Sequence, residues 1–168
     1  MNIFYLLLIP ALAYGLYVIA VLAFGTLNDY QPQEKVVIAG ENETEKMPDD
    51  SAILSFMTWN IGYGGLGAQS DFFLDGGMMV RPSKDISEAY KAGILHTIAA
   101  HKEVDFLLLQ EVDVQAKRSY FDNQFLSIGE ILPNYTRAHA LNFNVKFVPK
   151  PLLSIAPIGK VQSGLATY

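Results

Sequence analysis

The sequence predicts an α/β domain that follows an apolar N-terminal helix. Two nearly continuous apolar runs, over residues 52–60 and 104–110, are typical of strands whose two faces are both covered. Between them lies a pattern of apolar residues with the period of an amphipathic helix. An uncharged stretch at the start of the chain predicts the N-terminal helix.

That first stretch, residues 3–27, precedes all 12 Lys and Arg and all 17 Asp and Glu of the chain. As a helix it would be about 37 Å long, enough to cross a hydrocarbon core of about 30 Å. A cleaved signal peptide is the alternative, and the small-x-small pattern Ala23-Phe24-Gly25 supports it. The N-terminal region lacks the Lys and Arg of a typical signal peptide, and the apolar run is longer than the apolar region of a signal peptide, which is usually about 7–15 residues. An uncleaved, single-pass anchor over residues 1–27 is therefore favoured. The flanking charges do not decide which side of the membrane carries the domain.

Residues 28–50 are polar and are interpreted as a linker between this helix and a domain over residues 51–168. Within the linker, the segment KVVIAG at 35–40 predicts a short strand. The net charge of −5 argues against long-range attraction to polyanions such as nucleic acids. The chain has no cysteine, which excludes disulfides and thiolate metal sites.

The domain is expected to begin with a strand over 52–60, a glycine-rich loop and a helix from about Asp85 to His101. Asp85 and Glu88 have the spacing of a capping box, and isoleucines recur along one face of the helix. Gly76-Gly77 predicts a turn within the loop. The remaining predictions are a strand over 104–110, a short helix over 121–132, strands over 135–143 and 163–168, and a proline-containing loop over 146–160.

Asn60 closes the first strand, and Glu111 follows directly on the second. If the two strands are parallel neighbours, their carboxyl ends share one edge of the sheet, where ligands of open α/β sheets usually bind. A carboxylate, an amide and several waters suit Mg²⁺, which in turn suits phosphate-ester chemistry. The alternative is that both residues are polar only because their strands reach solvent.

The segments TWNIGYGG and DFLLLQEVD resemble the N-terminal half of the endonuclease/exonuclease/phosphatase family, which has the DNase I-like α/β sandwich fold. Gly164-Leu165-Ala166 is similar to a further strand of that family, so the resemblance covers about residues 52–168. It implies that Glu111 is a metal ligand and that Asn60 helps to hold the metal and the phosphate. Mg²⁺ is the implied cofactor, with Mn²⁺ as the alternative.

The family's second half supplies an Asp-x-Asn segment and a C-terminal Asp-His pair, which have no counterpart in these 168 residues. The sequence is therefore interpreted as an incomplete, N-terminal part of the fold, inactive by itself. His96 and His101 are expected at the surface or end of the helix, and His139 on a strand. Arg118 is a candidate for binding a substrate phosphate, and Arg81 a weaker one, the alternative for both being a solvated loop charge. Asp113 is interpreted as a loop or cap residue rather than a second ligand.

Two functions follow. The first is a membrane-anchored, Mg²⁺-dependent phosphoesterase, nuclease-like or similar to a lipid or sugar phosphatase. Its substrate would be a phosphodiester or phosphomonoester in a nucleic acid or a phospholipid head group, and no protein partner is inferred. The second is a non-catalytic, membrane-tethered binding module with a degenerate site. The second is disfavoured because half a sandwich would expose a long apolar sheet face.

Overall fold

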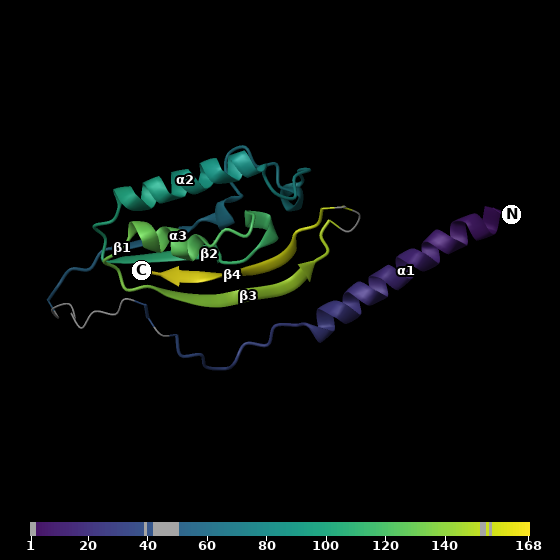
Figure 1. The fold of residues 1–168 in the computed structure, drawn as a ribbon, viewed down its shortest axis with the longest axis horizontal. Helices are drawn as coiled ribbons and strands as arrows, with labels where there is room; N and C mark the ends of the chain where they lie inside the picture. Colours follow the sequence, from purple (N-terminus) through teal and green to yellow (C-terminus); the bar gives the residue numbers. More distant parts are fainter. Residues whose placement is uncertain (1–2, 39, 42–50, 152–153, 155) are drawn as a thin grey trace.

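The computed structural model describes residues 3–38, 40–41, 51–151, 154 and 156–168. It shows an N-terminal helix, an irregular connection and a mixed α/β domain (Figure 1). The helix α1 spans Ile3–Leu27, which confirms the expected apolar helix. Residues Leu7–Leu27 are long and apolar enough to cross a membrane, and the helix stands apart from the domain core.

The domain is built on one four-stranded sheet with the order β1-β2-β4-β3. The strands are β1 (Phe56–Asn60), β2 (Phe106–Asp113), β3 (Ala138–Val148) and β4 (Gly159–Thr167). β1 and β2 are parallel, whereas β4 is antiparallel to both β2 and β3. The expected parallel arrangement of the first two strands is thus confirmed.

Two helices, α2 (Lys84–Ala100) and α3 (Gln124–Ile131), lie on the same side of the sheet (Figure 1). Ile98 of α2 and Ile128 of α3 pack in one core with Leu107 and Leu109 of β2. The opposite face keeps apolar side chains in solvent, including Phe56 at 61% and Leu165 at 44% exposure. The domain therefore has one covered and one open sheet face.

The described residues also contain three short 3₁₀ turns: η1 (Gly62–Gly64), η2 (Phe73–Asp75) and η3 (Lys117–Ser119). The predicted turn at Gly76-Gly77 is confirmed, with Gly76 left-handed at φ 90° and the Gly77 amide donating to Phe72.

The first strand is shorter than predicted, because the register with β2 starts at Phe56 and, among the described residues, the only backbone–backbone hydrogen bond of residues 52–55 runs from the Phe106 amide to the Ser55 carbonyl. The Asp105 carboxylate accepts hydrogen bonds from both the amide and the hydroxyl of Ser55, so the ladder begins only at Phe56. The predicted strand over 35–40 is wrong for its described residues, 35–38 and 40, which are irregular. A single bridge follows, where Glu41 pairs with Arg137.

The helix α2 begins one residue earlier than predicted, and the proposed capping box is wrong. Ser83 is the N-cap, and its hydroxyl accepts from the Ile86 amide at 3.4 Å. Asp85 instead lies in the first turn, where its negative charge interacts favourably with the positive end of the helix dipole.

The later strands are longer than predicted, because pairing overrides the polar and proline signals. β2 continues through Asp113, which pairs with Ser163. β3 continues to Val148, which pairs with Gly159 at the start of β4. The predicted loop over 146–160 therefore loses residues at both ends to strands, and its residues 152, 153 and 155 lie outside the described residues.

Candidate functional site

Asn60 and Glu111 lie side by side at one edge of the sheet, as expected. The parallel register pairs Asn60 with Gln110, the neighbour of Glu111. The Asn60 amide donates a hydrogen bond from Nδ2 to Glu111 Oε1 at 3.0 Å. The edge of the sheet thus carries a carboxylate held by an amide.

A β-bulge turns Glu111 out of the core. Between Leu109 and Val112, three steps along β2 face two steps along β4. Strict alternation would place Glu111 on the covered face with Leu107 and Leu109, whereas the bulge gives that place to Val112, which is fully buried. Glu111 has φ 54°, a left-handed conformation that is uncommon for a residue with a side chain. Such conformations concentrate at functional sites.

The Asn60 amide is oriented by its own loop. Its Oδ1 accepts from the Gly62 amide at 2.9 Å, which leaves Nδ2 directed at the carboxylate. Because the Gly62 amide is a donor, the atom of the Asn60 side chain that faces it must be the oxygen and not the nitrogen. As placed, Asn60 therefore positions Glu111 and does not direct an oxygen towards a cation.

Arg118 is not a solvated loop charge. Its Nε and Nη2 donate to the two carboxylate oxygens of Asp113 at 3.1 and 2.9 Å, and its guanidinium carbon lies 3.8 Å from the centre of the Tyr63 ring. The Asp113 side chain is fully buried, and the Arg118 side chain is 16% exposed. Asp113 is therefore a buried ion-pair partner, neither a loop nor a cap residue and not a second metal ligand.

Tyr63 is a residue of the site that the sequence analysis did not single out. It lies buried in η1 with φ 45°, and its carbonyl accepts from Gln124 Nε2 at 2.7 Å. Burial raises the pKa of the Tyr63 phenol to about 12; Arg118 opposes this shift, while the charge of Glu111 adds to it. Tyr63 thus joins Glu111 and Arg118 in one electrostatic neighbourhood. The only signal in the sequence was an aromatic residue set among the glycines of GYGG.

The donor set fits a cation that needs few protein ligands. Among the described residues, no group of three or more His, Asp or Glu side chains converges to form a metal cage. Of the two acids on β2, Glu111 offers a carboxylate that is partly open to solvent, whereas Asp113 is paired with Arg118. Mg²⁺ retains several waters and is often held by one or two carboxylates and a phosphate, so this set fits Mg²⁺ better than a metal that needs a complete protein cage.

The other candidates lie away from this pair or are engaged elsewhere. His96 is exposed on α2, and His101 ends that helix, as expected. His139 lies on β3 as expected, half-buried, with Nε2 3.3 Å from the Val112 carbonyl oxygen. Arg81 donates to the Lys117 carbonyl at 2.7 Å and lies over the Tyr120 ring.

No family model, no curated protein and no solved structure matches the chain.

Proposed function

We propose that the protein is a membrane-anchored, Mg²⁺-dependent phosphoesterase of the endonuclease/exonuclease/phosphatase family, with this sheet as one half of a DNase I-like sandwich. The observation that carries the proposal is the Asn60–Glu111 pair, which joins the last residue of β1 to the bulge near the carboxyl end of the parallel strand β2. The bulge that moves Glu111 out of the core supports it, because a solvent-seeking strand end needs no such distortion.

Each residue has a distinct role in this proposal. Glu111 holds the cation, and Asn60 holds Glu111 in the orientation that the cation needs. Arg118 binds a substrate phosphate: Asp113 and Ser163 engage its Nε and Nη2, and within the described part of the chain Nη1 has no hydrogen-bond acceptor. A guanidinium held in place by a buried carboxylate loses little freedom on meeting a second anion.

The cation would neutralise charge on the phosphate and lower the pKa of a bound water. The resemblance implies that the Asp and His that act on the water come from the family's second half. The chain's own contribution is therefore to hold the cation and to orient the phosphate.

The open sheet face and α1 bear on the rest of the proposal. The apolar side chains of that face, among them Phe56 and Leu165, suit a second sheet packed against them. We take α1 as an uncleaved anchor, which favours a phospholipid head group over a nucleic acid as the source of the phosphate. The net charge of −5 points the same way.

The test is Mg²⁺-dependent hydrolysis of a generic phosphodiester by protein expressed from the complete reading frame. Glu111→Gln should lower kcat/KM by about 100-fold or more and raise the Mg²⁺ concentration for half-maximal activity, because it removes the carboxylate that holds the cation. Asn60→Ala should cost about 10- to 100-fold, because Glu111 loses the donor that orients it.

Glu130→Gln is the matched control, since Glu130 is exposed at the end of α3. Equal activity of Glu111→Gln and the control would remove the metal-ligand assignment. Absence of divalent-dependent hydrolysis in the unaltered protein would favour the non-catalytic binding module.

A further inference from the structure

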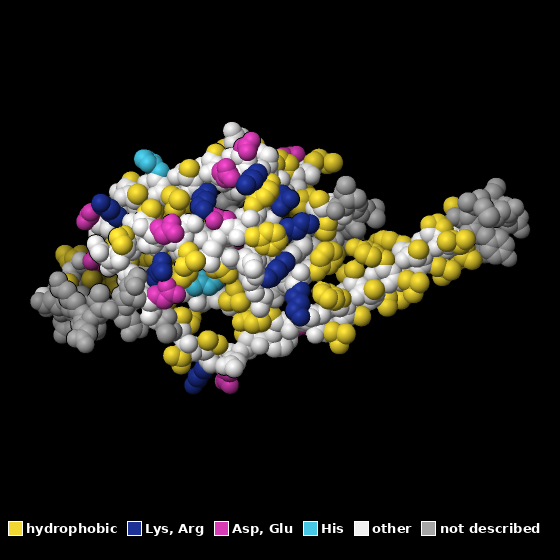
Figure 2. Space-filling model, in the orientation of Figure 1, with side chains coloured by type: hydrophobic (Ala, Val, Ile, Leu, Met, Phe, Trp, Pro, Cys, Tyr) yellow, Lys and Arg dark blue, Asp and Glu magenta, His cyan; other side chains and the backbone are white. Residues whose placement is uncertain are grey.

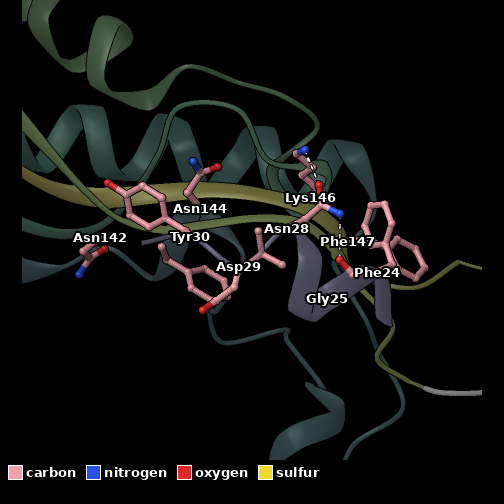
Figure 3. Close-up of a pocket in the computed structure, with 11 residues that line it drawn as sticks. Phe24, Gly25, Asn28, Asp29, Tyr30, Asn142, Asn144, Lys146 and Phe147 are labelled. Atoms are coloured by element: carbon pink, nitrogen blue, oxygen red, sulfur yellow. Dashed lines mark hydrogen bonds between the residues drawn. The ribbon is translucent and has the colours of Figure 1, made fainter. Parts of the chain in front are cut away.

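The end of the apolar helix lies against one end of the sheet. Asn28, the first residue after α1, accepts a hydrogen bond from Lys146 Nζ on β3. Figure 3 shows the pocket at this junction, lined by Phe24 and Asn28 from the helix end and by Lys146 and Phe147 from the strand. This contact identifies the carboxyl end of β3 as the part of the domain nearest to the end of α1.

The Asn60–Glu111 edge lies at the same end of the sheet. β2 and β3 are both antiparallel to β4, and β1 is parallel to β2, so β1, β2 and β3 run in one direction. Their carboxyl ends therefore share one end of the sheet. The candidate site and the end of the apolar helix are on the same side of the domain.

Cations line this end from one strand to the next. Lys160 on β4 lies opposite the bulged step of β3 that contains Lys146. The side chain of Lys117 lies against Gly159, the neighbour of Lys160, and Arg81 donates to the Lys117 carbonyl. We call Arg81, Lys117, Lys146 and Lys160 the basic row.

The members of the basic row are not paired with acids in the part of the chain that the structure describes, although Asp29 lines the same pocket as Lys146. Figure 2 shows several dark blue side chains gathered on the part of the domain that lies nearest to the apolar helix. A membrane crossed by that helix would therefore lie close to a group of cations.

The position of Lys146 gives the depth of the row. Its ammonium reaches Asn28, the residue directly after the last apolar residue, Leu27. If α1 spans a bilayer, this level is the head-group layer, which is about 5–7 Å thick on each side. Tyr30 lies at the same junction, and tyrosine is enriched at that depth in membrane proteins.

We infer that this end of the domain rests on the membrane surface, with the basic row against the phosphates of anionic phospholipids and the Asn60–Glu111 edge facing the head groups. Lys and Arg close to an anionic leaflet are attracted over about a Debye length. The inference rests on the proposed anchor, and it narrows the substrate of the proposed enzyme to a phosphate ester at the membrane surface.

The experiment places the full chain in vesicles of phosphatidylcholine alone and in vesicles with about 30% phosphatidylglycerol. A small uncharged amine-reactive reagent labels the lysines, and mass spectrometry measures the rate at each one. Lys117, Lys146 and Lys160 should be labelled about fivefold more slowly in the anionic vesicles, and high salt should reverse the effect. Lys102, exposed after α2 near the opposite end of the sheet, is the internal control and should not change.

A double variant, Lys146→Gln with Lys160→Gln, tests whether the row acts as a unit. Lys117 should lose its protection in this variant, and Lys102→Gln should leave that protection intact. Equal labelling of Lys117, Lys146, Lys160 and Lys102 in both vesicles would overturn the inference, as would full protection of Lys117 in the double variant. A chain that washes off the vesicles would remove both the anchor and this orientation. Hydrolysis is not measured, so failure of the catalytic proposal alone leaves these readouts unchanged.

Discussion

At the scale of single residues, the site depends on two acids of one strand, Glu111 and Asp113, which differ in burial and in hydrogen-bond partner. Glu111 is turned out of the core by a bulge and meets an amide, whereas Asp113 is fully buried and meets a guanidinium. A buried carboxylate keeps its charge only when its oxygens are paired. Arg118 satisfies both Asp113 oxygens, so Glu111 remains the acid that is available to a ligand.

The Asp113–Arg118 pair should therefore contribute strongly to stability. Arg118→Met would leave the buried Asp113 charge unpaired and should lower the free energy of unfolding by about 3–5 kcal/mol. Thermal unfolding of the full chain in mild detergent, followed by fluorescence of its one tryptophan, Trp59, measures the effect. The matched control is Lys84→Met, which breaks the exposed Lys84–Glu88 pair and should change stability by less than about 0.5 kcal/mol. Similar losses in both variants would contradict the prediction.

His139 should make the stability of the domain depend on pH. Burial holds the pKa of its imidazole below the usual value, despite the nearby Val112 carbonyl. The unfolded chain then binds the proton more readily, so stability is fully present above the unfolded-state pKa of about 6.5 and falls as the pH drops through it towards the folded-state pKa. His139→Gln should show a smaller fall in the unfolding midpoint between about pH 7.5 and pH 5.5. His96→Gln, at an exposed position on α2, is the control; an unchanged pH dependence in His139→Gln would contradict the prediction.

At the scale of elements, the boundaries are decided by hydrogen-bond partners more than by local pattern. β1 starts at Phe56, directly after Ser55, whose amide donates to the Asp105 carboxylate and not to a strand. α2 starts after Ser83, whose hydroxyl caps the helix. β3 extends to Val148 because β4 supplies partners along its length. The strand partners are distant in the sequence, and the N-cap is one of several nearby polar residues that could cap the helix.

The N-cap of α2 offers a direct test of this point. Ser83→Ala should lower the free energy of unfolding by about 1 kcal/mol, because the Ile86 amide loses its acceptor. Ser87→Ala makes the same chemical change inside the helix and should be neutral or slightly stabilising, because alanine is the better helix former. Thermal unfolding of the two variants measures the difference. Equal stability of the two variants would remove the assignment of Ser83 as the cap.

At the scale of the whole molecule, the domain and α1 meet at the end of the sheet that carries the candidate site. α1 shares no part of the core, and the side chains of Leu12, Leu16 and Ile19 are each about three-fifths or more exposed. A helix that is apolar on all sides and unburied suits a lipid environment.

The proposed anchor predicts how the chain behaves on extraction. The full chain should stay with membranes through an alkaline wash, and deletion of residues 1–27 should release the domain to the supernatant. Immunoblotting of the two fractions, with intact mass of the membrane-bound form, measures both outcomes. A mature mass that lacks α1 would show a cleaved signal sequence and would remove the anchor.

The sequence alone determined the apolar helix, the order of the main elements and the nearness of Asn60 and Glu111 on neighbouring parallel strands, although Glu111 lies inside β2 and not at its end. These features follow from local chemistry: uncharged length, apolar periodicity and the residues that close each strand. Only the tertiary structure decided that a bulge exposes Glu111, that Asp113 and Tyr63 hold Arg118, and that Lys146 meets the end of α1. Several of those arrangements join residues that are far apart along the chain, such as Tyr63 with Arg118 and Asn28 with Lys146, and a local sequence pattern carries no signal for such contacts.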